Sequence, residues 1–350
     1  MNKILVTGCA GNTGSYLCEL LLKDRNNLVI GIDNFFRGNE ENISTFINDE
    51  NFLFIKGDIR DFCMGPHCGS FSMMKESGCD LINIPSKFEI DQIYKTTGLE
   101  IVFYDIDEIY NLAAVVPTKY FYERPDLTYK VNCEAAINLF DLAVESGVKK
   151  FLNASSSEIY GHNSVNANEE TKSLYDSPED SVRWSYAHGK ILTEYYMNFY
   201  KDQIKVVHLR YANCAGRRDL DNNHVLPYII NSLIFGTELV LNKRPDDFSR
   251  SYLSMEDAAT ATLECMEKGI TGHAYNIGTQ ELLTIRQLFE KCCSHLKINP
   301  KVVNVKWELE RPGDPVSRIL DISRVTKEVG WTPKDNIDQI IDSVIGGIVK

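Results

Sequence analysis

The sequence has no apolar run that approaches the length of a membrane-spanning helix. It is also poor in positive charge, because 37 Lys and Arg face 49 Asp and Glu and give a formal net charge of −12. This acidity argues against a surface that binds nucleic acid or an anionic membrane. An acidic protein can still bind an anion where Arg, Lys and backbone N–H groups gather locally. No internal repeat or low-complexity tract is present.

The ten cysteines form no obvious disulfide framework. No signal peptide precedes the first apolar run, KILVTG, so we expect reduced thiols in a cytoplasmic protein. Cys63, His67, Cys68 and Cys79 gather in one stretch, but their spacing matches no paired zinc-ligand pattern. We therefore expect no metal site.

Short apolar runs alternate with amphipathic stretches through the first half of the chain. The runs that resemble buried parallel strands are KILVTG, LVIGID, FLFIKGD, EIYNLAA, KKFLNASS and IKVVHLRYAN. Between them, stretches such as CEAAINLFDLAVESGV have the pattern of a helix, and this one ends at Gly147. The alternation predicts an α/β fold, a Rossmann-type doubly wound parallel sheet with ligands at the carboxyl ends of its strands.

The alternation also predicts how the chain divides. We expect a Rossmann domain over residues 1–175, with an insertion near 62–95. Later strands and helices from about 204–214 and 254–270 are expected to return to it. Beyond about residue 170 the pattern loosens, since loops such as RRDLDNNHVLP interrupt shorter elements. Residues 176–350 should therefore form mainly a smaller C-terminal substrate-binding domain.

Three glycines follow the first strand in the stretch TGCAGNTGS, at Gly8, Gly11 and Gly14. A strand that turns sharply, exposes backbone N–H groups and starts a helix close to the sheet has no room for side chains there. The N-terminus of that helix would offer partial positive charge to a pyrophosphate. A tight turn without a ligand is the alternative, because such turns are common.

Acidic residues end the next two strands. Asp33 closes the second strand, where a carboxylate can accept both ribose hydroxyls of a dinucleotide and repel a 2′-phosphate. This favours NAD over NADP, with a solvated loop aspartate as the alternative. Asp58 and Ile59 end the third strand and are placed to border an adenine, although Gly-Asp is also a plain turn signal.

A tyrosine and a lysine lie one helical turn apart in the stretch RWSYAHGKILTEYY. Tyr186 and Lys190 share one helix face at this i, i+4 spacing. A tyrosine at its ordinary pKa of about 10 is a poor base at neutral pH. A neighbouring ammonium, with the positive nicotinamide, would stabilise the phenolate. The strand-end serines in FLNASSSEIYG can hydrogen-bond the same substrate oxygen.

With these motifs, and with YNLAA, LRYAN, RSYLSMEDAA, YNIG and RPGD, the chain resembles an extended short-chain dehydrogenase/reductase of the nucleotide-sugar epimerase/dehydratase/decarboxylase group. The resemblance covers nearly the whole length apart from about residues 62–90. It implies NAD as the cofactor and a nucleotide-diphosphate sugar as the substrate. The cofactor residues that it implies are Gly8, Gly11, Asn12, Thr13, Gly14, Asp33, Asn34, Asp58, Ile59, Leu112, Ala113, Ala114, Tyr186 and Lys190.

Asn12 and Thr13 depart from the family pattern, because most relatives carry a bulky apolar pair there. For the substrate, the resemblance implies that Asn213 touches the diphosphate and that Arg250 and Arg311 neutralise it. Asp314 would then lie beside the nucleotide ribose. Further substrate-binding residues are expected at Tyr120, Arg183 and Arg318.

The resemblance also implies a first step. Tyr186 takes the proton of the sugar C4 hydroxyl while a hydride passes to NAD, which leaves a 4-keto sugar. Counting back from Tyr160 places the catalytic hydroxyl on Ser156, with Ser155 and Ser157 as alternatives in the same run.

Glu158 bears on the second step. Simple 4-epimerases of this group usually carry a small or neutral residue at this place, whereas sugar 4,6-dehydratases and UDP-glucuronate decarboxylases carry glutamate. Tyr120 and Arg183 resemble the decarboxylases, and Arg318 aligns with an arginine that meets the sugar carboxylate in them. The expected second step is therefore Glu-assisted decarboxylation, dehydration or epimerisation. A strand-end carboxylate that caps local N–H groups is the structural alternative for Glu158.

Two other functions are compatible with the sequence. One is a simple nucleotide-sugar 4-epimerase or 4-dehydrogenase. The other is a non-catalytic NAD-binding sensor or scaffold, although such proteins typically lose the tyrosine–lysine pair that stands here. Relatives often associate through two long helices each, so we expect a homodimer with the helices near 134–147 and 185–201 at its interface. No nucleic-acid or membrane partner is expected.

Overall fold

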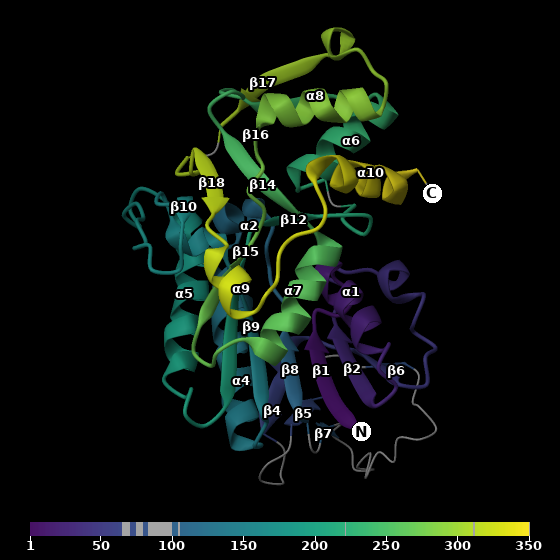
Figure 1. The fold of residues 1–350 in the computed structure, drawn as a ribbon, viewed down its shortest axis with the longest axis vertical. Coiled ribbons are helices and arrows are strands. Elements are labelled where there is room, and N and C mark those ends of the chain that lie inside the picture. Colours follow the sequence, from purple (N-terminus) through teal and green to yellow (C-terminus); the bar gives the residue numbers. More distant parts are fainter. Residues whose placement is uncertain are drawn as a thin grey trace.

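The computed structural model describes residues 1–64, 71–74, 80–82, 100–103, 106–220, 222–310 and 312–349. Its larger layer is an eight-stranded sheet in the order β15-β11-β9-β8-β1-β2-β3-β6 (Figure 1). The strands are β1 (Asn2–Thr7), β2 (Asn27–Asp33), β3 (Phe52–Lys56), β6 (Asp80–Ile82), β8 (Glu108–Asn111), β9 (Lys150–Ser156), β11 (Lys205–Tyr211) and β15 (Ala274–Ile277). Neighbours pair in parallel except β6, which is antiparallel to β3. The predicted doubly wound parallel sheet is confirmed.

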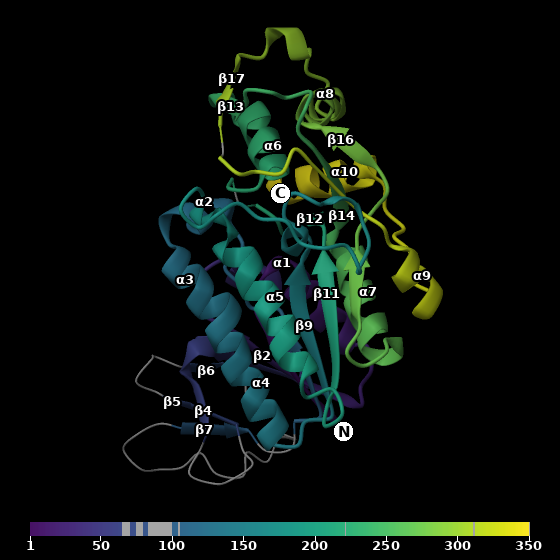
Figure 2. The same cartoon turned by 90° about the vertical axis from the view of Figure 1, so that its left-hand side faces the viewer.

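Helices cover both faces of this sheet. On one face lie α1 (Asn12–Leu21), α7 (Met255–Lys268) and α9 (Ser323–Glu328). Figure 2 shows the opposite side, with α2 (Thr118–Glu123), α3 (Pro125–Tyr129), the π-helix η4 (Lys130–Ala135), α4 (Ala136–Glu145) and α5 (Ser185–Asn198). Successive residues of a strand point to opposite faces, so Ile4 and Val6 pack toward α1 while Leu5 packs toward α4. Burial on both faces explains why these strands are apolar throughout.

A second, smaller sheet lies beyond the carboxyl ends of the first. Its order is β10-β18-β14-β12, with β16 paired to β14, and a separate pair joins β13 and β17. The strands are β10 (Val165–Ala167), β12 (Asn213–Ala215), β13 (Leu239–Asn242), β14 (Ser249–Ser254), β16 (Leu282–Thr284), β17 (Val305–Leu309) and β18 (Ser317–Leu320). The helices α6 (Val225–Phe235), α8 (Ile285–His295) and α10 (Ile337–Ile348) close a core of their own here.

Two details differ from the predicted division. β10 precedes residue 175 yet pairs with β18 of the smaller sheet, a partner about 150 residues away that no local pattern reveals. In the predicted insertion near 62–95, β6 joins the main sheet as its edge. The strands β4 (Phe62–Met64), β5 (Phe71–Met74) and β7 (Glu100–Phe103) form a small antiparallel sheet, which extends past the predicted end.

The side chains of Cys63, His67, Cys68 and Cys79 lie outside what the structure describes. Among the described residues, no group of three or more His, Cys, Asp and Glu side chains could hold a metal ion. No helix in the described part of the chain combines the length and the apolar character needed to cross a membrane.

The short 3-10 helices are η1 (Glu40–Ile43), η2 (Ile59–Asp61), η5 (Ser157–Tyr160), η6 (Val182–Trp184) and η7 (Pro300–Val302).

Candidate active site

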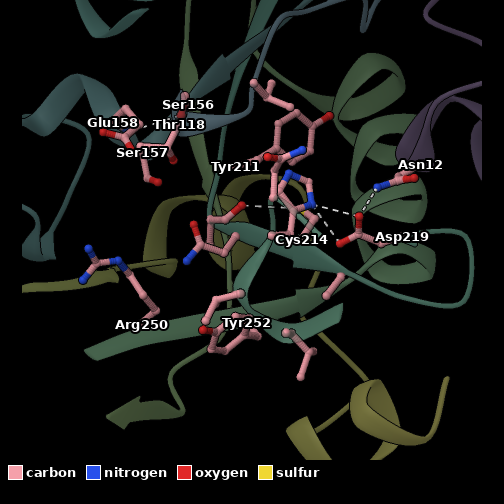
Figure 3. A pocket seen from close by; sticks show the side chains of 18 of the residues that line it. Asn12, Thr118, Ser156, Ser157, Glu158, Tyr211, Cys214, Asp219, Arg250 and Tyr252 are labelled. Atoms are coloured by element: carbon pink, nitrogen blue, oxygen red, sulfur yellow. Dashed lines mark hydrogen bonds and ion pairs between the residues drawn. The ribbon is translucent and has the colours of Figure 1, made fainter. Parts of the chain in front are cut away.

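One cavity of about 630 Å³ lies between the carboxyl ends of the main sheet and the smaller sheet. Figure 3 shows Ser156, Ser157 and Glu158 at one side of it and Asn12 with Asp219 at the other. The predicted site residues that line it are Gly8, Gly11, Asn12, Thr13, Gly14, Leu112, Ala114, Ser156, Glu158, Arg183, Tyr186, Lys190, Asn213, Arg250, Asp314 and Arg318. Those outside its lining are Asp33, Asn34, Asp58, Ile59, Ala113 and Tyr120. Arg311 lies outside the described residues.

The glycine turn has no room for side chains. A Cβ on Gly14 would lie 2.1 Å from the carbonyl oxygen of Gly8, and one on Gly8 would lie 2.9 Å from the backbone nitrogen of Ala113. Gly8 also has a φ of +70°, which favours glycine. Gly11 precedes α1 with no side-chain cap, so the positive helix N-terminus faces the cavity without a competing side chain. This cradle fits the diphosphate of a dinucleotide.

Asp33 stabilises the glycine turn through hydrogen bonds to its backbone. Its buried carboxylate accepts hydrogen bonds from the backbone N–H of Ala10 at 3.0 Å and of Phe35 at 2.8 Å. Burial raises the pKa of Asp33. Nearby, Asn34 donates to Asp58 at 2.7 Å, so the two predicted adenosine-side residues contact each other. Their roles toward the cofactor stay predictions.

Ser156, Tyr186 and Lys190 come together at the end of β9 beside α5. The Ser156 hydroxyl hydrogen-bonds the Tyr186 phenol and also accepts the Glu158 N–H at 3.2 Å. Ser155 points elsewhere, because its hydroxyl donates to the buried carboxylate of Glu194. Of the first two serines of the run, Ser156 is therefore the one at the tyrosine.

Burial sets the electrostatics of this trio. It raises the pKa of Tyr186, which the Ser156 hydrogen bond partly offsets. It lowers the pKa of Lys190 to about 8. The Lys190 Nζ donates to the Ala154 carbonyl at 2.7 Å and lies 5.9 Å from the centre of the Tyr186 ring. The ammonium is thus held in place next to a phenol that needs added positive charge to act as a base.

Five charged side chains form a cluster beside Tyr186. Arg183 binds Glu158 with Nη1 at 2.8 Å and Nη2 at 3.2 Å, and Arg318 Nη1 reaches the same carboxylate at 2.8 Å. Asp314 lies between Arg183 at 2.7 Å and Arg250 at 3.1 Å. Three guanidiniums face two carboxylates, so the cluster has an excess of one positive charge.

Glu158 is held as an anion by this cluster. Burial alone raises its pKa, but the guanidiniums of Arg183 and Arg318 outweigh burial and lower the pKa of Glu158 to about 2. Its carboxylate contacts Arg183 and Arg318, which is a different role from the cap of local N–H groups considered above. Asp314, predicted beside the nucleotide ribose, has one oxygen on Arg183 and the other on Arg250.

Some donors of the cluster have no acceptor. Arg183 Nε, Arg318 Nε and Arg318 Nη2 are buried and have no hydrogen-bond partner among the described residues. Buried polar groups in proteins are nearly always paired, and an unpaired one costs free energy. Unpaired guanidinium N–H groups in a cavity wall with excess positive charge indicate a site for an anion.

The polar residues of the cavity wall that sequence reasoning missed include Arg37, Asp219 and His224. Asp219 and His224 belong to the stretch RRDLDNNHVLP, which the sequence marked only as a loop. Its mixture of charged, amide and imidazole groups directly before an apolar helix was the available signal. Asn12, one of the two departures from the family pattern, contacts Asp219 at 2.9 Å.

A doubly wound sheet, a glycine turn without room for side chains, and a serine, tyrosine and lysine around one cavity are typical of dinucleotide-dependent enzymes. The chain belongs to the NAD dependent epimerase/dehydratase family, which its residues 4–278 match. The predictions of this family, of an enzyme and of NAD as its cofactor are confirmed.

Relatives within the family differ in what they catalyse. The chain is 28% identical to UDP-glucuronic acid decarboxylase 6 of Arabidopsis thaliana over 336 residues, which cover 95% of this chain and 84% of the relative. It is 25% identical to UDP-glucose 4-epimerase of Mycolicibacterium smegmatis over 340 residues, 95% of this chain and 94% of the relative. The solved UDP-glucose 4-epimerase of Thermotoga maritima with UDP-glucose shares the fold, with a TM-score of 0.78, 24% identity, and 99% and 98% of the two chains covered.

Proposed function

We propose that the protein decarboxylates a nucleotide-linked uronic acid, of the UDP-glucuronate class, after oxidising its C4 hydroxyl. The observation that carries this proposal is the buried arginine cluster around Glu158. Arg318 binds Glu158 with Nη1 and leaves Nε and Nη2 without a partner among the described residues, beside the predicted catalytic tyrosine. A sugar carboxylate would supply the missing acceptor and balance the excess positive charge.

The pKa of Glu158 supports decarboxylation over dehydration. Loss of water from C5 and C6 needs a protein base to take the C5 proton. A general base works best with a pKa near the working pH, and a carboxylate with a pKa of about 2 is a weak base at neutral pH. Decarboxylation needs no protein base to take the C5 proton, because the C5–C6 bond breaks instead and C6 leaves as CO₂. In this proposal Glu158 holds Arg183 and Arg318 in place.

The first step uses the trio at the end of β9. Tyr186 takes the proton of the C4 hydroxyl, the Ser156 hydroxyl hydrogen-bonds the same oxygen, and the Lys190 ammonium stabilises the phenolate. NAD, when bound over the glycine turn, supplies the hydride acceptor for this oxidation and the hydride donor for the final reduction.

The second step follows from the ketone. With a carbonyl at C4, the C6 carboxylate belongs to a β-keto acid, so the C5–C6 bond breaks and CO₂ leaves. The electron pair moves onto the C4 oxygen, where the hydroxyls of Tyr186 and Ser156 donate hydrogen bonds. C5 then takes a proton from solvent water as the C4 carbonyl re-forms, and C4 is reduced while Tyr186 returns its proton to the oxygen. The product is the corresponding nucleotide-linked pentose.

A substrate panel tests the proposal directly. The purified protein with NAD is incubated with UDP-glucuronate, UDP-glucose, dTDP-glucose and GDP-mannose, and the products are identified by mass. Loss of CO₂ from UDP-glucuronate is expected. Loss of water from a neutral sugar, or turnover with unchanged mass, would instead assign a dehydratase or an epimerase and refute decarboxylation.

A matched pair of arginine variants tests the cluster. Arg318→Gln should lower kcat/KM for the uronate by about a hundredfold or more, because a buried charge-assisted contact is lost. Arg324→Gln, six residues further and outside the cavity lining, should change kcat/KM little. Equal losses in both variants would contradict the assignment of Arg318 to the substrate carboxylate.

A further inference from the structure

A series of hydrogen-bonded polar side chains crosses the cofactor side of the cavity. Its members are Asn12, Asp219, His224 and Arg37. Asn12 donates through Nδ2 to Asp219 Oδ1 at 2.9 Å. His224 Nδ1 lies 2.8 Å from the same oxygen and 3.0 Å from Oδ2. On its other side, His224 Nε2 lies 3.5 Å from Arg37 Nη2. Figure 3 shows Asn12 and Asp219 side by side, joined by a hydrogen bond.

Proton positions in this chain follow from the partners. Arginine can only donate, so the contact with Arg37 makes His224 Nε2 an acceptor. With Nε2 facing a donor, the Nδ1–H of His224 points to Asp219. The Asp219 carboxylate, only 1% exposed, therefore receives donors from both sides, which compensates the burial of its charge.

The two end residues of this hydrogen-bonded series, Asn12 and Arg37, flank the glycine turn. Asn12 is the first residue of α1. Arg37 follows β2, and the next residue, Gly38, packs so closely on the turn that a Cβ there would lie 2.6 Å from the carbonyl oxygen of Ala10. Asp219 and His224, in contrast, come from the substrate side, between β12 and α6. Asp219 contacts Asn12 on one flank of the turn, and His224 contacts Arg37 on the other.

We propose that Asp219 and His224 are positioning residues that close a clasp over the diphosphate of NAD and slow its release. This rests on the family's use of NAD at the glycine turn and does not depend on which sugar reacts. The dinucleotide that lies on the turn is bordered by Asn12 and Arg37, and it can leave only when their contacts with Asp219 and His224 open. Slow release suits the proposed reaction, because the hydride removed from C4 is returned to C4 and no fresh cofactor is needed.

The test measures cofactor exchange rather than turnover. Wild type and Asp219→Ala are loaded with isotopically labelled NAD and separated from free NAD, and the loss of label into excess unlabelled NAD is followed. Asp219→Ala should exchange at least about tenfold faster, since two hydrogen bonds to a charged group are removed. The exchange rate should change by a larger factor than kcat at saturating NAD.

Controls separate the clasp from general loss of structure. Glu328→Ala breaks a histidine–carboxylate pair of similar length, 3.0 Å to His273, outside the cavity lining, and should leave NAD exchange unchanged. His224→Phe keeps an aromatic ring at this position and removes both contacts of His224, so it serves if Asp219→Ala folds poorly. Wild-type exchange rates in folded Asp219→Ala or His224→Phe would overturn the proposal, and so would a wild type that retains no NAD. Failure of the uronate panel with slow NAD exchange in the wild type would refute the proposed reaction and leave the clasp standing.

Discussion

Glu158→Gln probes the arginine cluster through stability. The pKa of Glu158 is about 2, against an ordinary value of 4.5, and the side chain is only 12% exposed. A displacement of this size corresponds to about 3 kcal/mol of preference for the charged form in the folded state. The neutral amide removes this contribution and leaves three guanidiniums facing the single carboxylate of Asp314. We therefore expect the variant to lose about 2–3 kcal/mol of unfolding free energy at pH 7.

The pH dependence gives the sign of the effect. Because the folded-state pKa is depressed, the stabilisation is fully present above about pH 4.5 and is lost as the pH falls toward 2. The difference between wild type and Glu158→Gln, measured by urea unfolding, should shrink to about half near pH 3. Glu264→Gln, which removes an exposed pair with Lys268 on α7, is the control and should cost less than about 0.5 kcal/mol. An unchanged stability at pH 7, or a difference that grows on acidification, would refute the reasoning.

Three further predictions concern the proposed catalytic trio and the glycine turn. Lys190→Met should abolish turnover yet raise the unfolding free energy near pH 7 by about 1–3 kcal/mol. The reason is that the buried Lys190 ammonium, with its pKa lowered to about 8, costs free energy in the folded state. Chemical unfolding at pH 7 and pH 10 measures this gain, which should shrink at pH 10 because Lys190 is then neutral in the folded state. Tyr186→Phe should lower kcat by about 10²–10⁴-fold with an unchanged near-UV CD spectrum, measured with the active substrate of the panel. Gly14→Ala should lose NAD binding and several kcal/mol of stability, because its new Cβ would clash with the Gly8 carbonyl oxygen. The control is Gly346→Ala, whose Cβ would have no atom within 4 Å and which should be neutral or slightly stabilising in thermal unfolding.

The sheet and the glycine turn could be predicted because their signals are local. Buried parallel strands are continuously apolar. A strand–turn–helix junction without room for side chains requires glycine at Gly8, Gly11 and Gly14, three positions within seven residues. The i, i+4 spacing of Tyr186 and Lys190 is also local. Each of these patterns can be found without knowing where the rest of the chain lies.

The charge cluster could not be predicted in the same way. Glu158 has partners 25 residues away at Arg183 and 160 residues away at Arg318. The family resemblance assigned all three to the substrate site, but no local pattern indicates that they contact one another. Counting back from Tyr160 favoured Ser156 but left Ser155 and Ser157 open, and the contact of Ser155 with Glu194 sets Ser155 apart from Ser156. Asn12 was visible as a departure from its relatives, but its partner Asp219 lies 207 residues later.

The same separations have a consequence for synthesis on the ribosome. The edge strand β15 of the main sheet ends at Ile277, and Arg318 follows later in the sequence. A nascent chain of about 200 residues therefore contains Glu158 and Arg183, but it lacks both the edge strand and the Arg318 guanidinium. The anion site is therefore assembled last, after the cofactor turn has its supporting strands. Chains that stop short of residue 318 would contain the glycine turn but would lack Arg318, the arginine proposed to bind the sugar carboxylate.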